Sequence, residues 1–250
     1  WQIWENGRLV EFCSSPSTNT ECRMEYALSG LIPSEIGNLT QLRKLSLESN
    51  KYIGVIPQEI GALKNMTDLT LSSNQLSGNI PSEIGELESL EHLALNSNAL
   101  AGYLPPEIEN LKNLKWVYLA SNYFTGRIPF AFGEMEGITY LNLSNNNLSG
   151  EIPSEIGNLI NLGKLHLNNN QFTGLIPETI CNIDMSFYNP YSFDISGNQL
   201  LPPYPDCVAE FVGYQYSEDC ASNYLFDGIC TEQSDLDVLQ KFIDNSSETI

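Results

Sequence analysis

A repeat with a period of 24 residues is the feature of this sequence that most restricts its fold. The glycines that keep this interval are Gly30, Gly54, Gly78, Gly102, Gly126, Gly150 and Gly174. The prolines in phase with them are Pro33, Pro57, Pro81, Pro105, Pro129, Pro153 and Pro177. The asparagines are Asn50, Asn74, Asn98, Asn122, Asn146 and Asn170, and Asn198 holds the same position after a four-residue insertion. A period of this length, held by three residue types, predicts a solenoid of stacked coils.

Each period follows the pattern L-x-x-L-x-L-x-x-N-x-L-x-G-x-I-P-x-x-I-G-x-L with small variations, as between Leu90 and Leu111. The alternation of Leu93 and Leu95 with other residues predicts a short strand with one buried face, and stacked coils pair such strands in parallel. The asparagine that follows can bond backbone groups of neighbouring coils that are otherwise buried and unpaired. A proline followed by Glu, Ile and Gly predicts a short helix or 3-10 turn on the opposite side of the coil.

This repeat resembles the leucine-rich repeat in its 24-residue form, whose L-x-G-x-I-P signature is associated with plant receptor-kinase ectodomains and polygalacturonase-inhibiting proteins. The resemblance covers residues 28–200. It implies an α/β solenoid, a horseshoe with a parallel concave β-sheet, short convex helical or 3-10 turns and about seven repeats. The two ends of the chain resemble secreted leucine-rich repeat proteins of environmental microbes, in which such blocks recur in tandem.

Both open ends of such a stack would expose leucine and isoleucine, so caps are required. We therefore divide the chain into an N-terminal cap with a degenerate first repeat over residues 1–27, a solenoid over 28–200, and a C-terminal cap over 201–250. Residues 7–12 predict the degenerate first strand. The apolar spacing of residues 235–243 predicts a short acidic amphipathic helix that packs on the cap or begins a next module.

Six cysteines lie near the two ends of the chain and leave its middle empty. They are Cys13, Cys22, Cys181, Cys207, Cys220 and Cys230. An even number without the C-x-x-C pairs of a zinc site favours disulfides and an oxidising compartment, and hence an extracellular or cell-surface location. We predict the short loops Cys13 to Cys22 and Cys207 to Cys220, and by elimination Cys181 with Cys230.

Charge and motifs exclude several classes of function. The formal net charge of −20 argues against nucleic-acid binding, which needs a basic face. The sequence contains no run of about 18 apolar residues, so we expect no insertion into a membrane. No complete calcium loop, phosphate loop or nucleophile motif occurs, and His92 and His166 stand about 14 Å apart by strand spacing. We therefore expect no enzyme, no cofactor and no metal site.

The residues that flank the inward leucines face the concave surface, and one group of them is a candidate binding site. Both histidines of the chain and a cluster of tryptophan and tyrosine fall there, flanked by hydrogen-bonding and charged side chains. The candidate residues are His92, Trp116, Tyr118, Tyr140, Asn142, Lys164 and His166. The alternative is that the rings stack on one another and only cover the sheet.

These observations predict a non-catalytic recognition module that binds a protein, peptide or glycan on its concave face. One alternative is an adhesive or structural spacer within a longer tandem surface protein, whose further modules would then be its neighbours. Another is an inhibitor of a cell-wall-degrading enzyme, which the resemblance to polygalacturonase-inhibiting proteins implies.

Overall fold

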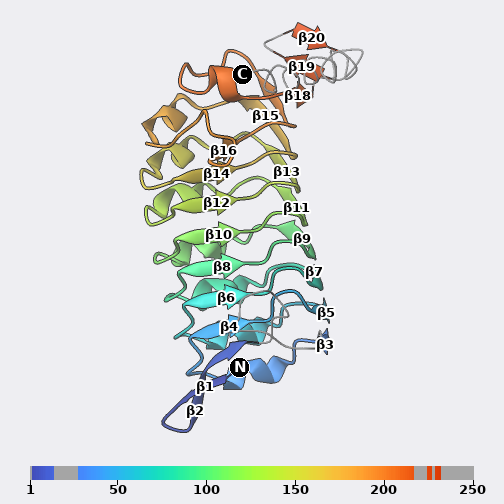
Figure 1. Cartoon of the computed structure of the whole chain (residues 1–250), viewed down its shortest axis with the longest axis vertical. Coiled ribbons are helices and arrows are strands. Elements are labelled where there is room, and N and C mark those ends of the chain that lie inside the picture. Colours follow the sequence, from blue (N-terminus) through green and yellow to red (C-terminus); the bar gives the residue numbers. More distant parts are fainter. Residues whose placement is uncertain (1, 14–27, 217–223, 227–228, 232–250) are drawn as a thin grey trace, which may run out of the picture.

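The structure is a computed structural model that describes residues 2–13, 28–216, 224–226 and 229–231. The described residues form a solenoid in which each complete coil adds one strand to each of two sheets and one 3-10 helix between them (Figure 1). The parallel strands, the short 3-10 helices and the stacked coils confirm the predicted leucine-rich repeat horseshoe.

The first sheet carries the predicted concave strands. Its strands are β1 (Gln2–Glu5), β2 (Arg8–Cys13), β4 (Lys44–Ser46), β6 (Asp68–Thr70), β8 (His92–Ala94), β10 (Trp116–Tyr118), β12 (Tyr140–Asn142), β14 (Lys164–His166) and β16 (Phe193–Asp194). From β2 onward all neighbours are parallel, while β1 folds back on β2 as an antiparallel hairpin. Because β2 pairs in parallel with β4, the degenerate first strand predicted over residues 7–12 is confirmed, although Gly7 lies in the turn before β2.

A second parallel sheet, which the sequence analysis did not predict, follows the asparagine turn in each coil. Its strands are β3 (Ser29–Leu31), β5 (Lys51–Gly54), β7 (Gln75–Gly78), β9 (Ala99–Tyr103), β11 (Tyr123–Gly126), β13 (Asn147–Gly150), β15 (Gln171–Leu175) and β17 (Gln199–Leu201). Figure 1 shows these strands stacked along one edge of the solenoid. The segments between the asparagine and the proline of each coil therefore form a second extended surface.

The 3-10 helices follow the repeated prolines, as predicted. They are η1 (Ser34–Asn38), η2 (Gln58–Ala62), η3 (Ser82–Glu86), η4 (Pro106–Asn110), η5 (Phe130–Glu134), η6 (Ser154–Asn158) and η7 (Glu178–Asn182), with a short η8 (Ala209–Phe211) near the C-terminal end. The proline precedes each of the first seven helices, where its missing N–H costs no hydrogen bond.

The core lies between the two sheets and the helices, and an asparagine ladder holds its corner. Leu93, Leu95 and Leu100 of one coil are fully buried. Asn122 in the next coil donates from Nδ2 to the Leu95 carbonyl at 3.0 Å and accepts the Leu100 backbone N–H at 3.0 Å. Each ladder residue thus satisfies backbone groups that burial would otherwise leave unpaired.

The C-terminal end closes the ladder with a different residue. Gln215 begins β18 (Gln215–Tyr216), which pairs antiparallel with β19 (Tyr224–Phe226) and through it with β20 (Ile229–Thr231). The buried Gln215 side chain accepts the Leu200 N–H at 3.1 Å and donates to the Ile195 carbonyl at 3.2 Å. The amide of Gln215 therefore replaces the asparagine that one more coil would supply.

The disulfide at this end differs from the predicted pairing. Cys181 is bonded to Cys207, with a Cα to Cα distance of 5.8 Å, so the predicted pairs of Cys207 with Cys220 and of Cys181 with Cys230 are wrong. The sequence separation of 26 is close to one coil, and stacking places residues one coil apart side by side. Closeness in sequence therefore does not predict which cysteines pair at this end of the chain, because the stacking of coils determines it.

Several predictions fall outside the described residues. Cys13 is disulfide-bonded, but Cys22, Cys220, Cys230 and the helix over residues 235–243 lie in the parts that the structure does not describe. The pairing of Cys13 with Cys22 and the division into three segments stay predictions. Across the described ranges, no helix has the length and apolar character needed to cross a membrane.

Candidate functional site

The candidate residues lie on four neighbouring strands of the first sheet, β8, β10, β12 and β14. In these strands the central residue is buried and its two neighbours face the concave surface. Trp116 pairs in register with His92 on one side and Tyr140 on the other. The constant register brings all seven predicted residues together, and we call them the concave patch.

The rings of the concave patch form an unbroken row of edge-to-face contacts. The His92 ring lies 6.2 Å from Trp116 and 5.4 Å from Tyr118, measured between centroids. The row continues from Tyr118 to Tyr140 at 4.6 Å and from Tyr140 to His166 at 5.8 Å. Edge-to-face geometry is favourable for aromatic pairs, so the row is rigid before any ligand arrives.

Exposure within the concave patch is uneven. Trp116 is 40% exposed and Lys164 is exposed, whereas both histidines and both tyrosines are partly buried. The Lys164 ammonium lies 5.3 Å from the centroid of the Tyr140 ring, within the range of a cation–π contact. The partly buried rings therefore support Trp116 and Lys164, which present the most accessible apolar and cationic groups.

Asn142 is partly engaged in hydrogen bonds within its own coil. Its Oδ1 accepts hydrogen bonds from the Ser144 backbone N–H at 3.0 Å and from the Ser144 hydroxyl at 2.7 Å. Asp194 makes the same pair of bonds to Ser196 two strands away. The carbonyl of Asn142 thus holds the turn after β12. Its amide nitrogen donates one long hydrogen bond of 3.5 Å to the Tyr140 hydroxyl, and its second N–H is left for a ligand.

Burial keeps both histidines neutral. It lowers the pKa of His92, although Asp68, whose Oδ1 lies 3.9 Å from Nδ1, raises it in part and Lys44 lowers it further. Burial likewise lowers the pKa of His166, against the attraction of Asp194. Among the described residues, Nε2 of His166 is buried without a hydrogen-bond partner. At neutral pH the cationic group of the concave patch is therefore Lys164.

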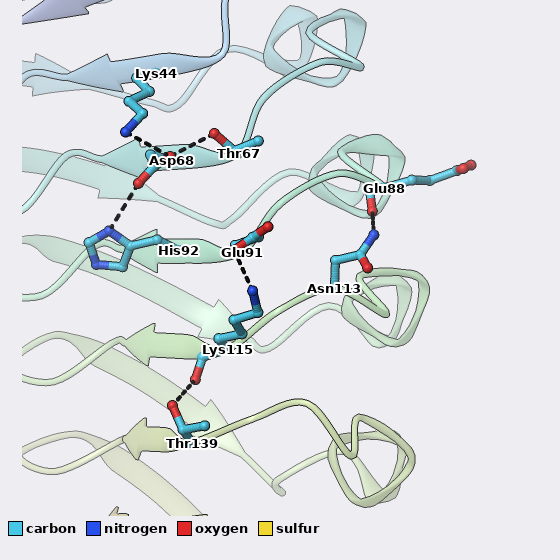
Figure 2. A network of polar contacts seen from close by, with 9 residues as sticks. All are labelled: Lys44, Thr67, Asp68, Glu88, Glu91, His92, Asn113, Lys115 and Thr139. Atoms are coloured by element: carbon cyan, nitrogen blue, oxygen red, sulfur yellow. Dashed lines mark hydrogen bonds and ion pairs between the residues drawn. The ribbon is translucent and has the colours of Figure 1, made fainter. Parts of the chain in front are cut away.

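A network of polar contacts borders the patch on its N-terminal side (Figure 2). Asp68 lies between Lys44 and His92, 3.8 Å from the Lys44 ammonium, and accepts a 2.6 Å hydrogen bond from the Thr67 hydroxyl. In the next coils the Lys115 ammonium bonds Glu91 at 2.6 Å and lies 6.0 Å from the Trp116 ring. These contacts fix the charges beside the aromatic row.

Sequence reasoning missed two members of this surface. Lys115 stands one residue before its strand, in a column that the sequence analysis did not assign to the concave face. Tyr191 is exposed and its backbone hydrogen-bonds His166, but it belongs to the coil with the four-residue insertion. Lys115 would have been found by including the residue before each strand. Tyr191 would have been found by aligning the coil with the insertion backward from Phe193.

The described part of the chain contains no group of three His, Cys, Asp or Glu side chains placed to hold a metal ion. The neutral histidines, the aromatic row and the lysines instead form a surface suited to non-covalent contacts.

Comparison with known proteins agrees with this architecture. A family model described as a leucine-rich repeat region matches residues 21–125, and another described as a leucine rich repeat matches residues 112–172. Together they cover more than half of the chain. Comparison with curated protein sequences gives no match.

Two similar solved structures are receptor ectodomains of Arabidopsis thaliana. The leucine-rich repeat ectodomain of GASSHO1/SCHENGEN3, solved with CASPARIAN STRIP INTEGRITY FACTOR 2, is 37% identical with a TM-score of 0.68, over 72% of this chain and 21% of that one. The ectodomain of HAESA, solved with an IDA peptide hormone, is 32% identical with a TM-score of 0.67, over 82% and 34%. The chain thus spans about a fifth to a third of these ectodomains.

A third similar structure is a plant ice-binding protein, 26% identical with a TM-score of 0.55, over 83% of this chain and 81% of that one. Repeat pattern, coil geometry and family matches all agree. The chain belongs to the leucine-rich repeat family, and its solenoid resembles those of plant receptor-kinase ectodomains.

Proposed function

We propose that the chain is a recognition module that binds an extended peptide on the concave patch and carries out no catalysis. The observation that carries the proposal is the unbroken aromatic row across four neighbouring strands, with Trp116 exposed within it. Aromatic side chains with few rotatable bonds give contact area at low entropic cost. The HAESA ectodomain supports the choice of a peptide, because its structure contains a peptide hormone.

The dimensions of the patch set a minimum length for the ligand. From β8 to β14 there are three strand spacings, or about 14 Å, which an extended peptide covers with about four residues. A ligand that crosses the strands would place an apolar or aromatic residue on Trp116 and an acidic group near Lys164. Within the described residues Lys164 has no ion-pair partner, so its charge is available to the ligand.

The fold alone does not choose among functions. The similar structures include peptide-hormone receptors and an ice-binding protein, and unrelated activities commonly share one fold. The proposal therefore depends on the side chains of the concave patch and not on the solenoid that carries them.

The test is selection from a displayed peptide library by the oxidised chain, with the Trp116→Ala/Tyr118→Ala variant as counter-screen. We expect peptides rich in aromatic and acidic residues that bind the wild type and not the variant. Phe130→Ala is the matched control, because Phe130 is a 62% exposed aromatic residue in η5, outside the concave sheet. Circular dichroism of each variant verifies that the solenoid is intact.

Other outcomes separate the alternatives. Peptides that bind wild type and double variant equally would place recognition elsewhere on the chain. Selection of no peptide would contradict the proposal and support a spacer. Inhibition of a pectin-degrading enzyme, unchanged in the variant, would instead support the inhibitor.

We further propose that the chain functions outside the cell, at the surface or in secreted form. The bond between Cys181 and Cys207 and the disulfide at Cys13 support an oxidising compartment. The resemblance to ectodomains of membrane receptor kinases supports the same location. Detection of the native chain in the extracellular fraction, with its cysteines oxidised, tests this proposal.

A further inference from the structure

Five strands of the second sheet carry an uncharged face on a strongly acidic chain, bordered by Lys51 in β5 and by Arg127 and Glu151 in the column of Tyr103. Three columns of residues point outward along β7, β9, β11, β13 and β15: the turn residue two positions before each strand and the first and third residues of the strand. We call these residues the lateral face, and they are Ser73, Gln75, Ser77, Ser97, Ala99, Ala101, Ser121, Tyr123, Thr125, Asn145, Asn147, Ser149, Asn169, Gln171 and Thr173. All are at least partly exposed and none is charged, although the chain has a net charge of −20.

Many polar groups of the lateral face are available to a ligand. Within the described residues, the hydroxyls of Thr125, Ser149 and Thr173 form no hydrogen bond to other protein groups. The same holds there for the side-chain amides of Gln75 and Gln171. Because the strands are parallel and in constant register, these neutral donors and acceptors recur at about 4.8 Å along the solenoid.

Two exposed tyrosines stand in the middle of this array. Tyr123 on the lateral face is 59% exposed, and Tyr103 at its border is 73% exposed. They lie on adjacent strands, with Tyr123 opposite Ala101 and Tyr103 opposite Thr125. Neither ring is needed to fill the core, and each offers an apolar face with a polar hydroxyl.

The Tyr103 ring is held in place by the coil that follows it. It lies over Gly126, where a Cβ would be only 2.5 Å from Cδ1 of the tyrosine. Gly126 has a φ of +77°, so the position favours glycine on conformational grounds as well. One face of the ring therefore rests on bare backbone, and the other is open to solvent.

Charge complementarity selects the kind of partner. An anionic polymer is repelled by the net charge of −20, and a cationic one is drawn to the many carboxylates elsewhere on the chain. An uncharged polymer with both hydroxyls and C–H faces matches the amides, hydroxyls and tyrosine rings. We propose that the lateral face, with Tyr103, is a binding site for a neutral polysaccharide, separate from the concave patch.

The test is co-sedimentation of the full chain with amorphous cellulose and with an insoluble β-1,3-glucan, and with polygalacturonate as the anionic counterpart. We expect binding to at least one neutral glucan and none to polygalacturonate. The Tyr103→Ala/Tyr123→Ala variant is expected to bind at least about ten-fold more weakly, since stacked rings contribute on that scale. Tyr103→Phe, which keeps the ring, retains binding.

The matched control is Tyr188→Ala, because Tyr188 is also 73% exposed but lies outside the lateral face. It should bind like the wild type, as should Trp116→Ala, which tests the concave patch alone. Absence of binding to both neutral glucans overturns the proposal, as does equal binding by the double tyrosine variant or equally tight binding to polygalacturonate. If the chain shapes ice crystals and binds no glucan, the lateral face binds ordered water instead, and the polysaccharide proposal is overturned.

Discussion

Single asparagines decide whether neighbouring coils can be buried against each other. Asn146 donates from Nδ2 to the carbonyls of Leu119 and Leu143, each at 3.1 Å, and its Oδ1 accepts the Phe124 N–H at 3.1 Å. The two carbonyls also accept hydrogen bonds from Asn122 and Asn170, so the Phe124 N–H is the group that depends on Asn146. The cost of removing the amide is therefore mainly the cost of leaving this buried N–H unpaired.

We expect Asn146→Ala to lower the free energy of unfolding by about 1–3 kcal/mol, since it leaves the buried Phe124 N–H unpaired and such a group costs about 1–3 kcal/mol. Asn147→Ala is the control, because the adjacent residue is exposed and its change should stay within about 0.5 kcal/mol. Urea unfolding followed by circular dichroism measures both. Equal effects at the two positions would contradict the role of the ladder.

The buried histidines add a pH dependence at the same scale. Burial lowers the pKa of His166 below its ordinary value of 6.5, so the unfolded chain takes up a proton there at higher pH than the folded chain. The stability due to the neutral ring is thus complete above about pH 6.5 and is lost as the pH falls through the lowered pKa.

We therefore expect the difference in unfolding free energy between wild type and His166→Gln to shrink as the pH falls from about 7.5 to about 5. Comparing the two proteins removes the titration of the carboxylates, which both share. Urea unfolding at a series of pH values gives the difference. A difference that stays constant or grows on acidification would show that burial does not hold His166 neutral.

At the scale of the element, the 3-10 helices stack because glycine lets their backbones approach. A Cβ at Gly133 in η5 would lie 2.2 Å from the carbonyl oxygen and 2.4 Å from Cβ of Glu155 in η6. Gly163 offers a contrast, because a Cβ there would lie 3.6 Å from the Thr139 carbonyl oxygen, an ordinary van der Waals distance, and the residue has no positive φ. The same substitution should therefore have opposite signs at the two positions.

We expect Gly133→Ala to destabilise the chain by about 1–3 kcal/mol through overpacking. Gly163→Ala should be neutral or stabilise it by up to about 1 kcal/mol, because alanine restricts the unfolded chain without a clash. Thermal and urea unfolding of both variants measure the contrast. Destabilisation of similar size in both would mean that the close approach of helices is not what requires glycine.

The elements differed in how well the sequence could predict them. The strands of the first sheet and the turns after proline were predictable, because buried leucines and the Pro-x-Glu-Ile-Gly pattern mark them directly. The second sheet was not, since segments such as Asn147–Gly150 carry a single buried residue and read as turns on their own. Their strand character depends on pairing with the next coil, which is a property of the stack.

At the scale of the whole molecule, stacking also determines which cysteines meet. We expect Cys181→Ser/Cys207→Ser to lower the free energy of unfolding by about 3 kcal/mol, the value for a loop of this order of size. Peptide mapping of the oxidised wild type should recover a linked pair of peptides that carry Cys181 and Cys207. Recovery of Cys207 linked to Cys220 would support the chain-local pairing instead.

The candidate site was predictable to the extent that it follows the period. Regular coils place Trp116 and Tyr140 side by side, so counting residues was enough to group them. The internal bonds of Asn142 and the approach of Tyr191 to His166 depend on side-chain conformation and on the inserted coil, which spacing does not encode. The lateral face was missed because its sheet was missed.

The central claim is that the concave patch, and not the solenoid in general, recognises a peptide. The most direct measurement is the Kd of a selected peptide for wild type, Trp116→Ala and Phe130→Ala by titration calorimetry. We predict that Trp116→Ala raises the Kd at least about ten-fold, or about 1.4 kcal/mol, while Phe130→Ala leaves it within about two-fold. An unchanged Kd in a folded Trp116→Ala protein would contradict the claim.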